Sequence, residues 1–119
     1  MAKKKKYSLF IGRYQPLHAG HIKLIRTVLN EGKNVCIALR DTNISNTDPY
    51  DDKERFIMCL NEFHKEMAEG RLVVITIPDI EEVVYGRKVG WGIRQIKLDD
   101  KTESISATKI RKKMKDGKN

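Results

Sequence analysis

Three short, almost continuously apolar segments alternate with two segments in which apolar residues recur at helical spacing. Apolar runs of this length are typical of strands buried in a parallel sheet, whereas a 3.6-residue period is typical of amphipathic helices. In chain order we expect strands over 7–12, 34–39 and 72–77, a helix over 20–31, and a helix capped by Asp51 or Asp52 that ends before Gly70. This alternation predicts one α/β domain, a doubly wound parallel sheet with right-handed crossovers and helices on both faces.

The remaining segments give weaker signals. Residues 83–85 and 93–98 are shorter strand candidates separated by glycines, and a polar helix is expected to begin at Ser106 and to run to about Lys115. On the second helix, four apolar residues recur at i, i+4, i+7 and i+11, which predicts a stripe facing the core. They are Phe56, Leu60, Phe63 and Met67.

The net charge of +8 is concentrated at the two ends of the 119-residue chain. We expect a basic, solvated tail over 1–6 and a single domain over 7–116, in which opposite charges nearly balance until the basic stretch near its end. Because positive charge is not in excess between the two basic ends, no nucleic-acid partner is expected. No segment approaches the roughly 18 apolar residues of a membrane helix, and Cys36 and Cys59 lack partners at metal-ligand spacing. These features predict a cytoplasmic protein without membrane association, whose cysteines are small core residues.

The loop after the first strand carries two histidines, three residues apart, at the start of a helix. It reads Gly12-Arg-Tyr-Gln-Pro-Leu-His18-Ala-Gly20-His21. The spacing places both imidazoles on one side, and Gly20 lets backbone amides and the positive end of the helix approach a phosphate closely. Two imidazole donors aimed at a non-bridging oxygen would stabilise the charge that develops when an α-phosphorus becomes five-coordinate. The loop is therefore predicted to be an anion site that needs no covalent nucleophile.

Other interpretations of His18 and His21 stay open. The pair has the spacing of two metal ligands, but no third ligand accompanies it, so we predict no metal held by side chains. The two rings could instead be solvated or cap the helix. Acid–base catalysis by one of them is a further alternative, secondary because the attacking group on such substrates is often already a phosphate anion.

A second motif opens the C-terminal helix and reads Ile105-Ser-Ala-Thr-Lys-Ile-Arg111. Taken alone, Ser106 is an ordinary N-cap, and basic residues on an exposed helix are commonplace. Together with the first site, the segment predicts a second phosphate-binding site. Its hydroxyls and free amides would hold the β- and γ-phosphates, and Arg111 would neutralise charge on the departing pyrophosphate.

These two motifs resemble the HxGH and ISxTxxR motifs of the nucleotidyltransferase superfamily, the cytidylyltransferase-like proteins, in the same order and about a domain apart. The resemblance covers essentially the whole chain. It implies a Rossmann-like fold, Mg²⁺ with a nucleoside triphosphate, and direct attack of a small phosphorylated acceptor on the α-phosphate with release of pyrophosphate. It also implies a homodimer or higher homo-oligomer. Carried over by motif, the catalytic residues are His18, His21 and Arg111, and the nucleotide-binding residues are Gly12, Arg13, Tyr14, Gly20, Lys23, Ser106 and Thr108.

Two branches of the superfamily share features with this chain. Gly12-Arg-Tyr-Gln-Pro16 resembles archaeal-type nicotinamide-mononucleotide adenylyltransferases, in which Arg13 would touch the ATP phosphates, and the segments 48–50, 54–55 and 78–80 resemble that group too. The segment 18–24 and the length resemble glycerol-phosphate cytidylyltransferases, which usually carry Phe-Asp in place of Tyr-Gln. ATP is therefore the favoured donor, and transfer from CTP to an alcohol phosphate is the alternative.

The acceptor site is the least defined part of the sequence. The stretch after Pro78 is short by the standard of the mononucleotide adenylyltransferases, in which a longer region helps to hold the acceptor. The candidate acceptor-binding residues are Arg40, Asp41, Arg87 and Trp91. Two functions of other classes remain as rivals, a non-catalytic nucleotide-binding module and a nucleic-acid-binding module that uses the basic ends.

Overall fold

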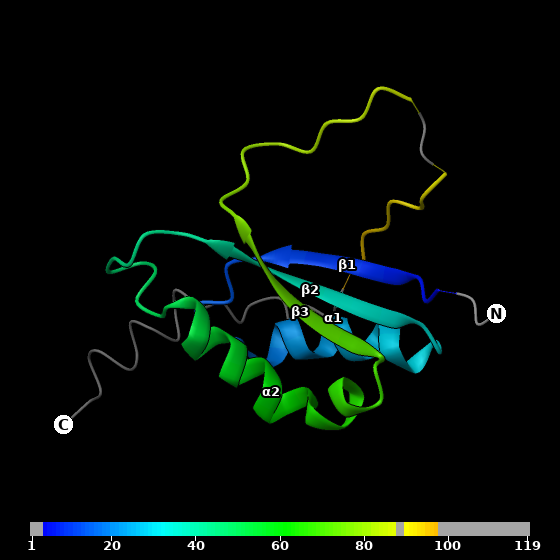
Figure 1. Cartoon of the computed structure of the whole chain (residues 1–119), viewed down its shortest axis with the longest axis horizontal. Coiled ribbons are helices and arrows are strands. Elements are labelled where there is room, and N and C mark those ends of the chain that lie inside the picture. The colour runs from blue at the N-terminus through cyan, green and yellow to red at the C-terminus, as the bar shows by residue number, and fades with distance from the viewer. Residues whose placement is uncertain (1–3, 88–89, 98–119) are drawn as a thin grey trace.

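The secondary structure follows the predicted alternation (Figure 1). A computed structural model of the chain describes residues 4–87 and 90–97. Its elements are β1 (Tyr7–Gly12), α1 (Ala19–Asn30), β2 (Asn34–Asp41), α2 (Asp52–Ala68) and β3 (Leu72–Pro78). The three expected strands and two expected helices are thus confirmed, with ends that differ by at most two residues.

The weaker strand candidates are not strands. Residues 83–85 and 93–97 have no regular secondary structure, so the prediction of strands there is wrong. Val83 and Val84 are exposed, and an isolated apolar run without a neighbouring strand has no partner for its backbone hydrogen bonds. The helix expected from Ser106 lies outside the described residues.

The sheet has the order β1-β2-β3, with both neighbouring pairs parallel. Gly12 pairs with Leu39, and Arg40 pairs with Ile77, so the three strands end at the same edge of the sheet. The segments that follow β1 and β2 lead from this edge to α1 and α2. Ligands of parallel α/β sheets bind at such carboxyl ends.

Both helices lie on one face of the sheet (Figure 1). Val35, Ile37 and Leu39 of β2 are fully buried there, in one cluster with residues of both helices. The strands follow one another across the sheet without a reversal of order, and right-handed crossovers in such an order stay on the same side. The Rossmann-like α/β class is confirmed, and within the described part of the chain only one face carries helices.

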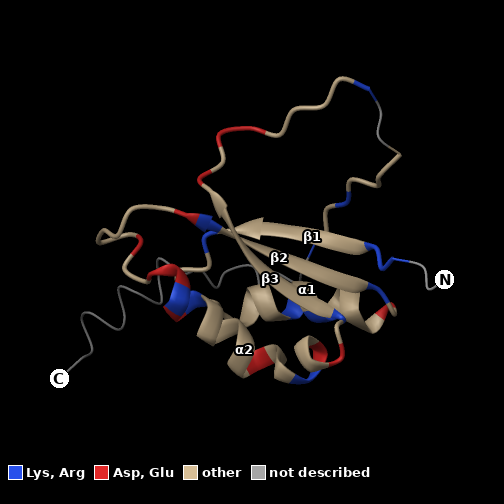
Figure 2. Cartoon of the chain, in the orientation of Figure 1, with Lys and Arg blue, Asp and Glu red and all other residues tan. Residues whose placement is uncertain are grey.

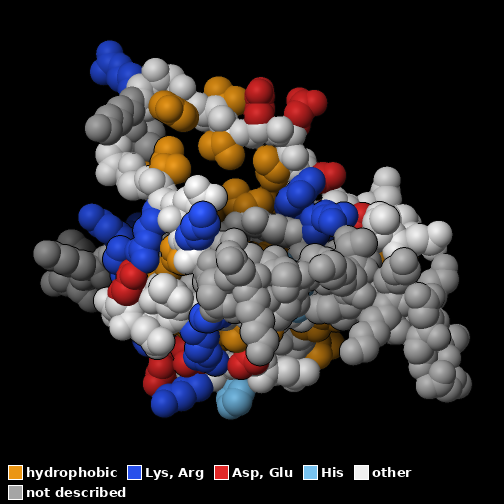
Figure 3. All heavy atoms as spheres, turned by 180° about the vertical axis from the view of Figure 1, so that it is seen from behind, with side chains coloured by type: hydrophobic (Ala, Val, Ile, Leu, Met, Phe, Trp, Pro, Cys, Tyr) orange, Lys and Arg blue, Asp and Glu red, His pale blue; other side chains and the backbone are white. Residues whose placement is uncertain are grey.

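The opposite face of the sheet is partly open. Leu9 and Ile11 of β1 and Ile75 of β3 are 58%, 40% and 44% exposed. The segment after β3 arches away on this side of the sheet (Figure 1). Figure 3 shows hydrophobic side chains gathered beneath the arch.

The buried face of α2 differs from the predicted stripe. Phe63 is fully buried and Met67 packs against the core, as expected. Phe56 and Leu60 are each 38% exposed, so their assignment to the core is wrong. The buried positions are instead Arg55, Cys59 and Phe63. Arg55 takes an inward position that its charge conceals in a hydrophobicity pattern, and the helix is kinked at Phe63, which changes the phase of the stripe.

The basic N-terminal segment is not wholly solvated. The Lys5 ammonium donates to the carbonyls of Glu69, at 3.4 Å, and Gly70, at 3.2 Å. The Tyr7 hydroxyl also donates to the Gly70 carbonyl, at 3.2 Å. These donors satisfy backbone groups just beyond the end of α2, where helix carbonyls lack intrahelical partners and attract cations.

Candidate active site

His18 and His21 form a reciprocal cap at the start of α1. His18 is the N-cap residue, and its Nδ1 accepts a hydrogen bond from the Gly20 N–H at 3.1 Å. The His18 N–H donates in turn to His21 Nδ1 at 3.2 Å. This is the arrangement of a capping box, a motif usually built from Ser or Thr with Glu or Gln. The capping interpretation is confirmed, and because each ring takes part through Nδ1, its Nε2 stays outside the cap.

The cap determines which nitrogen of each ring carries the proton. Because both Nδ1 atoms accept hydrogen bonds, the neutral rings carry their protons on Nε2. The two rings are stacked, with centroids 3.7 Å apart and planes inclined by 20°. The site therefore presents two adjacent Nε2–H donors at a helix N-terminus.

Burial keeps both rings neutral. It lowers the pKa of His21 to about 4, and the neighbouring His18 lowers it further in the same direction. Burial also lowers the pKa of His18. A general base works best when its pKa is close to the working pH, so a His21 pKa of about 4 argues against acid–base catalysis by this ring. Neutral donors that keep their protons fit the stabilisation of negative charge.

Tyr14 supports His21 from the core. Its ring is 5% exposed and lies edge-on to the His21 imidazole, with centroids 4.7 Å apart. Burial, followed by the nearby Cys59, raises the pKa of Tyr14, so its hydroxyl stays protonated. The ring is closed to a ligand, and any part of Tyr14 in nucleotide binding comes from its backbone or through His21.

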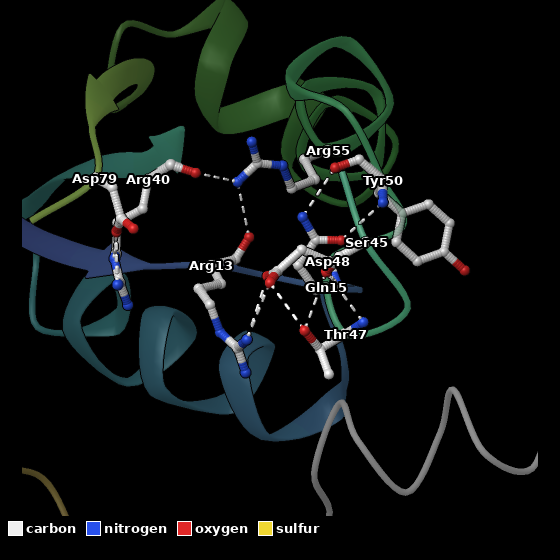
Figure 4. Close-up of polar contacts among 9 residues, drawn as sticks. All are labelled: Arg13, Gln15, Arg40, Ser45, Thr47, Asp48, Tyr50, Arg55 and Asp79. Carbon is white, nitrogen blue, oxygen red and sulfur yellow. Dashed lines mark hydrogen bonds and ion pairs between the residues drawn. The ribbon is translucent and has the colours of Figure 1, made fainter. Parts of the chain in front are cut away.

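Polar side chains tie this loop to the segment before α2 (Figure 4). Arg13 Nη1 lies 3.2 Å from Asp48 Oδ1, in a partly buried ion pair. The buried Gln15 amide forms two bonds with the Tyr50 backbone, donating to the carbonyl at 2.8 Å and accepting from the N–H at 2.9 Å. Local sequence patterns do not reveal Gln15 or Asp48 as site residues, since each acts on a residue 35 positions away.

Arg55 is a further site residue that the sequence patterns did not predict. It is 1% exposed, and it donates to the carbonyls of Asp51 at 3.2 Å, Arg13 at 2.9 Å and Arg40 at 2.7 Å. Three segments that meet at the carboxyl edge of the sheet are thereby joined by one guanidinium (Figure 4).

The candidate acceptor residues fall into two groups. Arg40 and Asp41 lie at the end of β2, and the Arg40 guanidinium pairs with Asp79 just after β3, at 2.6 Å. Charged residues thus lie at the end of β2 and just beyond the ends of β1 and β3, at the same edge of the sheet (Figure 2). Arg87 and Trp91 are exposed in the loop after β3, and Trp91 is 78% exposed.

The remaining predicted residues are placed only in part. Gly20 is buried under the cap, and Lys23 is exposed on the first turns of α1. Ser106, Thr108 and Arg111 lie outside the described residues. Within the described ranges, no three His, Cys, Asp or Glu side chains gather as a metal site. Over the same ranges, no helix has both the length and the apolar character needed to cross a membrane.

Comparison with known proteins agrees with the predicted resemblance. Residues 9–66, which hold β1, α1, β2 and most of α2, match the family model described as cytidylyltransferase-like. Together with the relatives below, this match confirms the resemblance to the nucleotidyltransferase superfamily.

The similar proteins are nicotinamide-nucleotide adenylyltransferases. The protein of that name from Thermococcus kodakarensis is 36% identical over 78 residues, which are 63% of this chain and 42% of the relative. The one from Methanococcus aeolicus is 28% identical over 134 aligned positions, covering 90% of this chain and 76% of the relative. The chain thus spans about two fifths of the length of the Thermococcus relative. The Methanococcus alignment is longer than the 119 residues of this chain, so that relative has residues without a counterpart here.

Proposed function

We propose that this chain transfers AMP from ATP to a small phosphorylated acceptor and releases pyrophosphate. The observation that carries the proposal is the pair of stacked imidazoles at the N-terminus of α1, whose Nδ1 atoms accept the capping hydrogen bonds and whose Nε2–H groups stay outside the cap. Negative charge grows on the non-bridging oxygens of the α-phosphate during in-line attack. Preorganised donors and a helix N-terminus stabilise that charge without reorganising during the reaction.

Cationic and hydroxyl side chains would bind the rest of the triphosphate. Arg13 follows β1 directly, and Asp48 holds its guanidinium near the same edge, where it would contact the triphosphate. Ser106, Thr108 and Arg111 would bind the distal phosphates, as the motif resemblance implies. Because the attacking group is a phosphate anion, no general base is required, which agrees with the low pKa of His21.

Nicotinamide mononucleotide is the acceptor that we propose, since the similar proteins are named for its adenylylation. Arg40 and Asp41 at the end of β2 are the first candidates to contact it, and Trp91 and Arg87 are the second. Support for Arg40 comes from its place at the carboxyl edge beside Asp79.

Magnesium would enter with the triphosphate. Mg²⁺ prefers oxygen ligands, and among the described residues no three His, Cys, Asp or Glu side chains gather to hold it. Phosphate oxygens and water would therefore supply most of its ligands. When bound, the ion neutralises phosphate charge, and the protein residues orient the α-phosphate.

Pyrophosphate release from Mg-ATP with nicotinamide mononucleotide tests the proposal. His18→Ala and His21→Ala should each lower kcat by roughly 10²- to 10³-fold, the scale for losing one oxyanion-type donor. His64→Ala is the matched control, because the third histidine of the chain is exposed on α2.

Two results would contradict this function. If CTP with an alcohol phosphate releases pyrophosphate faster than ATP with nicotinamide mononucleotide, the protein is a cytidylyltransferase. If ATP binds but no acceptor yields pyrophosphate, the chain is a nucleotide-binding module. Full turnover in a folded His21→Ala protein would show that the imidazole pair does not stabilise charge on the α-phosphate.

A further inference from the structure

We propose that Arg55 is the positioning residue of the two-histidine site, acting through the Arg13 carbonyl and the Tyr14 ring. Its contribution to turnover rests on the proposed function, whereas its effect on His21 can be observed without any substrate.

In the described part of the chain, the buried Arg55 guanidinium binds backbone carbonyls and not carboxylates. Its side chain is 1% exposed, and an arginine remains charged, so removing it from water costs free energy that its surroundings must offset. The partners that the structure shows are backbone carbonyls, two of which lie outside its own helix: Arg13 at 2.9 Å and Arg40 at 2.7 Å. A buried cation that binds carbonyls of separate segments fixes the positions of those segments relative to one another.

The Arg13 carbonyl adjoins an uncommon backbone conformation in the loop. It belongs to the peptide bond that precedes Tyr14, and Tyr14 has a φ of +52°, in the left-handed region. Bulky residues rarely adopt this conformation, which persists only where the surroundings impose it. The hydrogen bond from Arg55 fixes the orientation of that peptide. Removing it frees the loop to relax toward an ordinary backbone conformation.

A relaxed Tyr14 would change the surroundings of His21. The Tyr14 ring is buried and lies 4.7 Å from the His21 ring, centroid to centroid. The same ring packs against Gly12, where an added Cβ would lie only 3.0 Å from Tyr14 Cζ, so its present position is closely determined. The path from Arg55 therefore runs through two contacts, the Arg13 carbonyl and the Tyr14 ring, to the imidazole that would face the phosphate.

The experiment compares Arg55→Met with Asp51→Ala. Asp51 caps the same helix, accepting from the Glu54 N–H at 2.7 Å, so its loss weakens the start of α2 without removing the bond to Arg13. In Arg55→Met, NMR titration should show the His21 pKa rising from about 4 toward the ordinary 6.5, because the ring becomes more exposed. The Asp51→Ala protein should keep the His21 titration of the unmodified chain.

Kinetics supply a second readout. Displacement of a catalytic group by about 1 Å can cost 10²-fold, so kcat in Arg55→Met should fall about 10- to 100-fold, with a change in KM for ATP below about threefold. Arg55→Lys, which keeps a cationic donor, should recover part of the kcat. Equal effects of Arg55→Met and Asp51→Ala on kcat would show a general loss of stability and overturn the proposal.

Tyr14→Leu keeps the inference testable if Arg55→Met does not fold. With Arg55 in place but the aromatic ring gone, the His21 titration should shift in the same direction. An unchanged His21 signal in Tyr14→Leu or in folded Arg55→Met overturns the proposal. A shifted signal in a protein that adenylylates no acceptor supports the positioning role while the proposed function fails.

Discussion

Acidification should destabilise this protein through His21, and the structure gives the size of the effect. The pKa of His21 is about 4 in the folded chain, whereas the unfolded side chain has its ordinary value of 6.5. Between these values the unfolded state binds more protons than the folded state, so stability is lost as the pH falls from 6.5 toward 4. Lowering the pH from 7 to 5 would cost about 2 kcal/mol for a fully buried ring. His21 is partly exposed, and solvent screening reduces the expected loss to about 1 kcal/mol.

Urea unfolding of the unmodified chain and of His21→Gln at pH 7 and pH 5 measures this contribution. Glutamine is a natural partner in a capping box, so the variant keeps the helix cap but does not titrate. The free energy of unfolding of His21→Gln should fall by about 1 kcal/mol less between the two pH values. His64→Gln, on the exposed surface of α2, should behave like the unmodified chain. Equal losses in all three proteins would refute the assignment of a buried, neutral His21.

Two predictions concern the packing of the loop after β1. Gln15→Ala removes two hydrogen bonds to the Tyr50 backbone from a site that is 1% exposed, and should lower the free energy of unfolding by about 2–3 kcal/mol. A loss below about 0.5 kcal/mol in urea denaturation would show that these two hydrogen bonds contribute little to the stability of the fold. Gly12→Ala places a Cβ 3.0 Å from Cζ of the buried Tyr14 ring, and overpacking of this kind should cost about 1–3 kcal/mol. Gly86→Ala, with no heavy atom within 4 Å of the added Cβ, is the control and should leave the melting temperature unchanged.

Local sequence patterns predicted the sheet because each strand is apolar enough to be recognised alone. Residues 83–85 have the same character, yet Val83, Val84 and Tyr85 are 73%, 78% and 63% exposed. A strand requires a neighbour that accepts and donates its backbone hydrogen bonds, and no local pattern reveals whether that neighbour exists. Apolar runs that alternate with helical segments were therefore reliable, whereas an isolated run was not.

The same limit explains which site residues were missed. His18 and His21 act on each other and on Gly20, all within one helical turn, so their spacing was enough to find them. Arg55 acts on a carbonyl 42 positions away. A buried arginine also has the appearance of a surface residue in a hydrophobicity pattern, and the pattern therefore indicated Phe56 and Leu60 where Arg55 and Cys59 are buried.

The choice of histidine at the cap links the stability of α1 to its chemistry. A serine at position 18 would also cap the helix through its hydroxyl, but its remaining donor would be on the same oxygen that accepts the capping bond. An imidazole has two nitrogens on different edges of the ring: Nδ1 accepts the Gly20 N–H, and Nε2 keeps a proton for a ligand. His21 repeats the arrangement, with Nδ1 bound to the His18 N–H. The hydrogen bonds that hold the helix start therefore also set the tautomers of the two rings, so a substitution that preserves only the cap should keep the fold and lose the donor.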